Sequence, residues 1–140
     1  MNSLFNPESV ALLFARTLLA VLFIFQGYDK LFRIGPEEVA KSLYPSFQKF
    51  GISRSLFQTG IWLNAFIEFA CGLFLLMGLL KYVSLSLLGL NMLLVSAAMS
   101  LVNPVWDMKL IFPRFLLLLF ILLFPDEYDV LSLSYFLKSL

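Results

Sequence analysis

Apolar residues form four long runs along the chain, separated by polar stretches. The runs cover about residues 10–32, 57–80, 82–102 and 110–124. A helix needs about 20 apolar residues to cross the hydrocarbon core of a bilayer, and the first three runs reach that length. The fourth run is shorter, and Pro113 near its start predicts a kink. The pattern predicts an all-α integral membrane protein in which four helices form an antiparallel bundle.

The long connection between the first and second runs has an amphipathic pattern. Its apolar residues recur at near-helical spacing: Val39, Leu43, Phe47 and Phe50. We expect a helix over about residues 37–50 that lies on the membrane surface and breaks near Pro45. A loop helix packed on the end of the bundle is the alternative. After Pro125 the sequence predicts a second interfacial helix.

The amino-acid composition is typical of an integral membrane protein. Hydrophobic residues make up 61% of the 140 residues and charged residues 14%, well below the roughly 25% of a soluble domain. The mean hydropathy is +0.92. The length predicts one domain over residues 1–140. The net charge is +1 and basic residues form no tract, so we expect a lipid partner and no nucleic acid.

The chain lacks the residues that most redox and nucleophilic sites require. It has no histidine and one cysteine, Cys71. This argues against His-ligated haem, a His-based metal site, a His-activated nucleophile, a disulfide within the chain and a CxxC motif. We therefore expect no metal and no covalent cofactor. Any redox role would use a bound organic cofactor or partner subunits. The first basic residue is Arg16, inside the apolar run, so we expect a membrane anchor in place of a signal peptide.

Three charged residues lie within the apolar runs: Arg16, Glu68 and Arg114. An ionised side chain in hydrocarbon costs at least about 2.5 kcal/mol, so such residues usually face a bundle interior and have partners. Helical spacing places Arg16 and Lys30 on one stripe of the first helix. Asn64 and Glu68 share a stripe of the second helix, and Asn91 lies on a stripe of the third.

The sequence favours an ion pair between Arg16 and Glu68 at a polar pocket, with Asn64 and Asn91 nearby. An ion pair that only fixes helix packing is the alternative. Lys30 and Lys81 each follow a glycine by three residues, and capping of a helix C-terminus would explain both. Arg114 is expected to extend toward the membrane interface.

Most basic residues lie at the end of the bundle that carries the long connection, among them Arg33, Lys41, Lys49 and Arg54. Cytoplasmic loops carry an excess of Lys and Arg. The distribution therefore predicts a cytoplasmic long connection and both termini on the other side.

Two blocks of the sequence resemble the DoxX family of small four-helix membrane proteins. The first is ARTLLAVLFIFQGYDKLF, and the second is IEFACGLFLLMGLLKYVSLSL. The resemblance implies Arg16, Lys30 and Glu68 as signature polar residues. The family often has a Ser-Leu-Asp turn after its last helix. Here Leu131-Ser132-Leu133-Ser134 occupies that place, without the aspartate.

The resemblance implies a membrane subunit of a redox or oxidative-stress complex, in a bacterial cytoplasmic membrane. Relatives are similar to subunits of thiosulfate:quinone oxidoreductase, so a quinone is the candidate cofactor. A polar pocket with Arg16, Gln26 and Glu68 would orient the head group of a quinone or lipid. A protein partner or a second copy of the chain is expected. The alternative is a non-catalytic scaffold, chaperone or small-solute carrier, because the missing His and Cys argue against catalysis by this chain alone.

Overall fold

The computed structural model describes residues 6–103 and 108–139, and the side chains of residues 6–103 and 111–137. Over these residues the chain forms helices and no strand. The elements in order are α1 (Pro7–Tyr28), a π-helical turn (Asp29–Arg33), α2 (Pro36–Phe47), a 3-10 turn (Gln48–Phe50), α3 (Arg54–Met77), α4 (Lys81–Val102), α5 (Met108–Leu123), a 3-10 turn (Asp126–Tyr128) and α6 (Leu133–Ser139).

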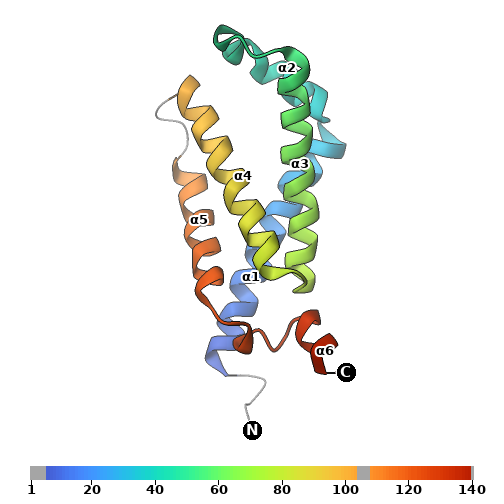
Figure 1. Ribbon diagram of the computed structural model, residues 1–140, viewed down its shortest axis with the longest axis vertical. Coiled ribbons are helices and arrows are strands. Elements are labelled where there is room, and N and C mark those ends of the chain that lie inside the picture. Colours follow the sequence, from blue (N-terminus) through green and yellow to red (C-terminus); the bar gives the residue numbers. More distant parts are fainter. Residues whose placement is uncertain (1–5, 104–107, 140) are drawn as a thin grey trace.

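Four of the helices lie side by side (Figure 1). α1 contacts α3 and α5, and α4 contacts the same two helices. In Figure 1, α1 and α4 run toward α2, whereas α3 and α5 run back toward α6. The two ends of the molecule are therefore called the α2 end and the α6 end. Between the helices lies an apolar core whose fully buried side chains include Leu12, Leu19, Leu75, Leu88 and Ile121.

Three helical segments are long and apolar enough to cross a membrane: Pro7–Arg33, Arg54–Met77 and Lys81–Val102. α5 is shorter, with an apolar part over Ile111–Leu123. Large apolar side chains on the outer surfaces remain exposed, such as Phe14 at 68% and Leu94 at 62%. In water this would be unfavourable, so the outer surface is suited to lipid.

Two glycines bring the backbones of α1 and α3 close together. A Cβ atom at Gly27 would lie 2.5 Å from the backbone nitrogen of Phe69, and one at Gly72 would lie 3.0 Å from that of Ile24. Small residues at such crossings let membrane helices approach closely. These contacts fix how far α1 is shifted along α3, and so decide which side chains of the two helices meet.

The long connection is helical, as the sequence predicts, but the helix does not break near Pro45. α2 continues through Pro45 to Phe47 and packs on the start of α3. The rings of Phe47 and Phe57 have centroids 4.9 Å apart, and the Tyr44 hydroxyl donates to the Ile52 carbonyl at 3.0 Å. The chain leaves the helix through the following 3-10 turn and Gly51, whose φ of 72° suits glycine.

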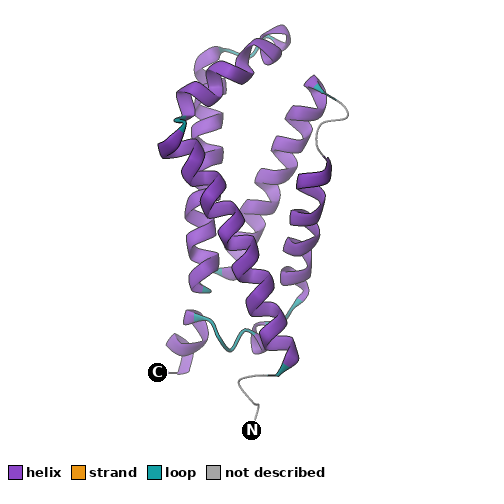
Figure 2. Ribbon diagram, turned by 180° about the vertical axis from the view of Figure 1, so that it is seen from behind, coloured by secondary structure: helices purple, strands orange, loops and turns teal. Residues whose placement is uncertain are grey.

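The C-terminal segment is only partly the helix that the sequence predicts. After α5 the chain makes a 3-10 turn, and α6 has only 7 residues. Figure 2 shows the non-helical stretch between α5 and α6 running across the α6 end of the bundle. Its backbone and side chains supply partners for buried cations of the bundle.

Candidate functional site

A lysine–glutamate ion pair joins α1 to α3 inside the bundle. The Lys30 ammonium donates to both carboxylate oxygens of Glu68, at 2.7 and 2.9 Å, and to the Asn64 amide oxygen at 2.9 Å. Glu68 is only 3% exposed. An ammonium has three N–H donors, and all three are used. The burial and the short distances make this a tight pair.

The location of Lys30 follows from helix geometry. Lys30 continues the α1 stripe that includes Arg16 and Gly27, and it lies in the π-helical turn, where the Ile34 N–H donates to the Asp29 carbonyl at 2.8 Å. Side chains on a helix lean toward its N-terminus. Lys30 therefore reaches back along α1 to Glu68 and does not act as a simple helix cap.

Asparagines extend the ion pair to a third helix. The Asn64 amide donates to the Asn91 amide oxygen on α4 at 2.9 Å. The amide nitrogen of Asn91 is buried and has no partner among the described residues. Lys30, Asn64, Glu68 and Asn91 are called the polar cluster below. It links α1, α3 and α4 through hydrogen bonds that hydrocarbon cannot replace.

A cavity of about 440 Å³ lies beside the polar cluster, between α1, α4 and α5. We call it the α5 pocket. Its polar side chains are Gln26, Asp29, Glu68 and Arg114, and its apolar wall includes Phe23, Met92, Val95 and Ile111. The Arg114 guanidinium donates to the Gln26 amide oxygen. Arg114 therefore turns into the bundle, and the prediction that it extends to the membrane interface is wrong.

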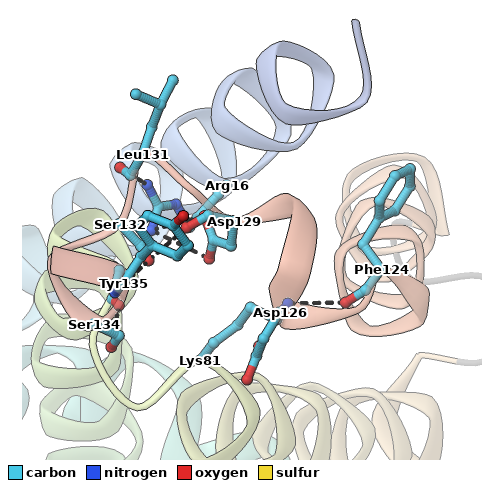
Figure 3. Close-up of polar contacts among 10 residues, drawn as sticks. Arg16, Lys81, Phe124, Asp126, Asp129, Leu131, Ser132, Ser134 and Tyr135 are labelled. Atoms are coloured by element: carbon cyan, nitrogen blue, oxygen red, sulfur yellow. Dashed lines mark hydrogen bonds and ion pairs between the residues drawn. The ribbon is translucent and has the colours of Figure 1, made fainter. Parts of the chain in front are cut away.

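Arg16 does not pair with Glu68, so that prediction is also wrong. At the α6 end, Arg16 lies 3.4 Å from an Asp129 carboxylate oxygen and donates to the Leu131 carbonyl at 3.0 Å (Figure 3). A Cβ atom at Gly78 would overlap the Arg16 guanidinium, so Arg16 is level with Gly78. Gly78 caps the C-terminus of α3 and follows Glu68 by ten residues, or about 15 Å at 1.5 Å per residue.

Lys81 also binds the C-terminal segment. It is the first residue of α4, so capping of the preceding helix does not explain it. Its ammonium donates to the Phe124 carbonyl at 2.9 Å and lies 3.2 Å from Asp126 (Figure 3). The Ser134 hydroxyl donates to the Gly78 carbonyl at 2.6 Å. Together with Arg16, these contacts fasten the chain after α5 across the α6 end, an arrangement called the C-terminal latch below.

The latch contains a carboxylate that the sequence analysis did not identify. The Ser-Leu-Asp turn of the resembling family is missing, but Asp129 supplies a carboxylate just before that position. Burial raises the pKa of Asp129, although the positive charges of Arg16 and Lys81 act in the opposite direction. A buried arginine needs a partner, and this need could have directed attention to the carboxylates that follow the fourth apolar run.

A larger cavity of about 680 Å³ adjoins the latch and includes Lys81, Asp129 and Tyr135 in its lining. Lys81 and Asp129 already face opposite charges from the chain itself. The α5 pocket is the better candidate because, among the described side chains, its arginine has the neutral Gln26 amide as hydrogen-bond partner and no carboxylate within ion-pair distance. No group of three His, Cys, Asp or Glu residues within the described part of the chain is placed to hold a metal ion.

The predicted site residues thus divide between the two ends. Gln26 and Glu68 line the α5 pocket. Lys30 donates to Glu68 and to Asn64, and Asn64 donates to Asn91. Arg16 belongs to the C-terminal latch. Cys71 is buried in the core. Arg114 is the pocket residue that the predicted site lacked, and its location in an apolar run was the signal.

Comparison with protein families supports the sequence resemblance. Residues 11–102 match the DoxX family, a range that includes the whole polar cluster and Gln26 but ends before Arg114. No curated protein and no solved structure matches the chain. The matched range covers more than half of the sequence and includes the second and third membrane-capable helices and most of the first, and the chain therefore belongs to the DoxX family of membrane proteins.

Proposed function

We propose that this protein is a membrane subunit of a redox or oxidative-stress complex, and that the α5 pocket binds the polar head of a quinone or lipid. In this proposal α5 crosses the bilayer with α1, α3 and α4 as an antiparallel four-helix bundle in a bacterial cytoplasmic membrane. The observation that carries the proposal is a cavity of about 440 Å³ with a mainly apolar wall and an arginine on one side.

The residues around the pocket suit a quinone head group. Ligand sites commonly combine an apolar wall with a few convergent polar groups. Phe23, Met92 and Val95 supply part of the wall, and Arg114 and Gln26 carry N–H groups that could donate to a ring carbonyl. When bound, a quinone would supply two-electron chemistry that the side chains of this chain cannot.

The polar cluster holds one wall residue of the pocket, Glu68, in a fixed position. Glu68 lines the cavity, yet both its oxygens accept from Lys30. A carboxylate held in this way keeps a fixed position and adds little free charge to the cavity. In the proposal the cluster positions α3 against α1, and Arg114 with Gln26 contacts the ligand.

A non-catalytic scaffold or carrier is the second candidate. The observation that favours it is the chain of hydrogen bonds from Lys30 through Asn64 to Asn91, which joins three helices without a ligand. Such a network can stabilise packing alone. A protein of this kind would bind a partner in fixed ratio with its pocket unoccupied.

The two candidates differ in what the α5 pocket holds. We would purify the full chain from its membrane under mild conditions and identify bound small molecules by mass spectrometry. We would then titrate the delipidated protein with a neutral, short-tailed benzoquinone. Arg114→Gln should weaken binding by about tenfold, the value of one charge-assisted hydrogen bond. Arg54→Gln, an identical change at an exposed position, is the matched control.

The proposal requires saturable binding that depends on Arg114. No co-purified amphiphile and no saturable quinone binding would overturn it. A partner protein in fixed ratio, together with an empty pocket, would establish the scaffold.

A further inference from the structure

The charges around the α5 pocket do not balance. Each carboxylate there already has its own cation: Asp29 lies 2.9 Å from Arg33, and Glu68 lies 2.7 Å from Lys30. Arg114 is the third cation of the group. Among the described side chains, Arg114 and the two paired cations Lys30 and Arg33 together carry one positive charge more than the two carboxylates neutralise.

Arg114 holds that surplus charge. Its hydrogen-bond partner is the neutral Gln26 amide, and within the described side chains no carboxylate lies within ion-pair distance of it. A cation on a span helix beside an apolar wall is unfavourable unless it is paired or hydrated. Its guanidinium is also a planar fork of donors that matches oxyanions in geometry.

From this imbalance we infer that the α5 pocket takes an anionic head group of the phosphate or sulfate type, with Arg114 as its binding residue and Gln26 beside it. The inference rests on the proposed function, in that both place a ligand in this pocket, and it adds the ligand's charge. Gln26 holds Arg114 in place when no anion is bound. Arg114 lies on α5, beyond the 11–102 family match, whereas Gln26 lies inside it.

Two sources could supply such an anion. Arg114 is six residues into α5, about 9 Å from the start of the helix, and Gln26 lies close to the end of α1. Both are therefore nearer to the α2 end (Figure 1). A lipid phosphate at that face could reach Arg114 while its acyl chains follow the apolar wall, and a small free oxyanion could enter from the same side.

The test measures thermal unfolding of the full chain in lipid nanodiscs. One set contains only zwitterionic phosphatidylcholine, a second also contains phosphatidylglycerol, and a third is phosphatidylcholine with added inorganic phosphate or sulfate. A ligand that binds the folded state raises the unfolding temperature. A rise with phosphatidylglycerol alone identifies a lipid head group, and a rise with the inorganic anions identifies a free oxyanion.

Substitutions assign the response to the pocket. Arg114→Gln should abolish the rise, Arg114→Lys should retain part of it, and Arg54→Gln should leave it unchanged. If Arg114→Gln does not fold, Gln26→Glu provides the same test, since its new carboxylate would pair with Arg114. We expect Gln26→Glu to be more stable than the unmodified protein in phosphatidylcholine and to lose the response to anions.

Two results would overturn the inference: no rise for the unmodified protein in either anionic condition, or an equal rise in Gln26→Glu. Saturable binding of the neutral benzoquinone without any anion response would refute the anion preference and leave the proposed function intact. Absence of both responses would refute both.

Discussion

The two ends of the bundle provide carboxylate partners for cations in different ways. Each pairs a cation from one helical stripe of α1 and its π-helical turn with a carboxylate: the partly buried Lys30 at the α2 end and the buried Arg16 at the α6 end. Lys30 meets a carboxylate of a neighbouring span helix at 2.7 Å, whereas Arg16 meets Asp129 of the C-terminal segment at 3.4 Å. A tight pair between span helices fixes helix packing, while a looser pair with a returning segment fastens the end of the chain.

The ends also differ in charge balance. At the α6 end, Arg16 faces Asp129 and Lys81 faces Asp126, so each of these two cations has a carboxylate partner. At the α2 end, the hydrogen-bond partner of Arg114 among the described side chains is the neutral Gln26 amide. The C-terminal latch is therefore complete in itself, and the α5 pocket lacks one negative charge, which is why a ligand is proposed there.

The largest expected effect of a substitution is at the tight pair. Lys30→Gln removes the cation that binds Glu68 directly and leaves a buried carboxylate without an ion pair, and loss of one partner of a buried pair typically costs about 3–5 kcal/mol. Adding Glu68→Gln should recover part of the loss, because two amides can hydrogen-bond. Thermal unfolding in detergent measures both variants.

The control for this prediction is a double-mutant cycle on a pair of residues that do not contact each other. Arg16→Gln and Glu68→Gln should add within about 0.5 kcal/mol, since the two residues share no partner. Additive losses for Lys30 and Glu68, or strong coupling between Arg16 and Glu68, would contradict the assignment of partners.

A smaller effect is expected at the crossing of α1 and α3. In Gly27→Ala the new Cβ would lie 2.5 Å from the Phe69 backbone, and the helices must separate at a cost of about 1–3 kcal/mol. Separation should also weaken the contact between Lys30 and Glu68. Gly60→Ala is the matched control on α3, where a Cβ meets nothing within 4 Å, and it should raise stability by about 0.5–1 kcal/mol. Equal losses for the two variants would argue against a close crossing.

The loose pair should tolerate substitution better. Asp129→Asn should lower the free energy of unfolding by about 1–3 kcal/mol, less than Lys30→Gln, because the buried Arg16 guanidinium loses a partner that lies as far away as 3.4 Å. Arg16 also keeps the Leu131 carbonyl. Thermal unfolding and limited proteolysis after Leu123 measure stability and latch closure separately. A loss as large as that of Lys30→Gln would show that the two pairs are equivalent.

The smallest expected effect is a pH dependence at the α6 end. The raised pKa of Asp129 means that the folded protein holds this proton more tightly than the unfolded chain. The resulting contribution to the free energy of unfolding is present at acidic pH and is lost as the pH rises through the folded-state pKa. Comparing unfolding of the unmodified protein and Asp129→Asn across mildly acidic pH isolates this contribution. As the pH rises, the free energy of unfolding of the unmodified protein should decrease relative to that of Asp129→Asn. The same pH dependence in both proteins would contradict this prediction.

The sequence by itself determined the helices and the faces on which their polar residues lie. Runs of about 20 apolar residues predict helices long enough to cross a bilayer. The period of 3.6 residues per turn places Arg16, Gly27 and Lys30 on one face of the first helix. The amphipathic pattern around Val39 likewise predicted α2, because its residues are adjacent in sequence. These features depend only on local geometry and hydropathy.

Only the tertiary structure decided which charges meet. Arg16 and Lys30 are 14 residues apart on one stripe, about 21 Å along the helix, so either could face Glu68 depending on how far α1 is shifted along α3. The contacts at Gly27 and Gly72 set that shift and bring Lys30 to Glu68. The partner of Arg16 comes from a segment more than 100 residues later that folds back across the bundle. Helical periodicity gives the face of a side chain but not its level against a neighbouring helix, because the level is set by packing between elements distant in sequence.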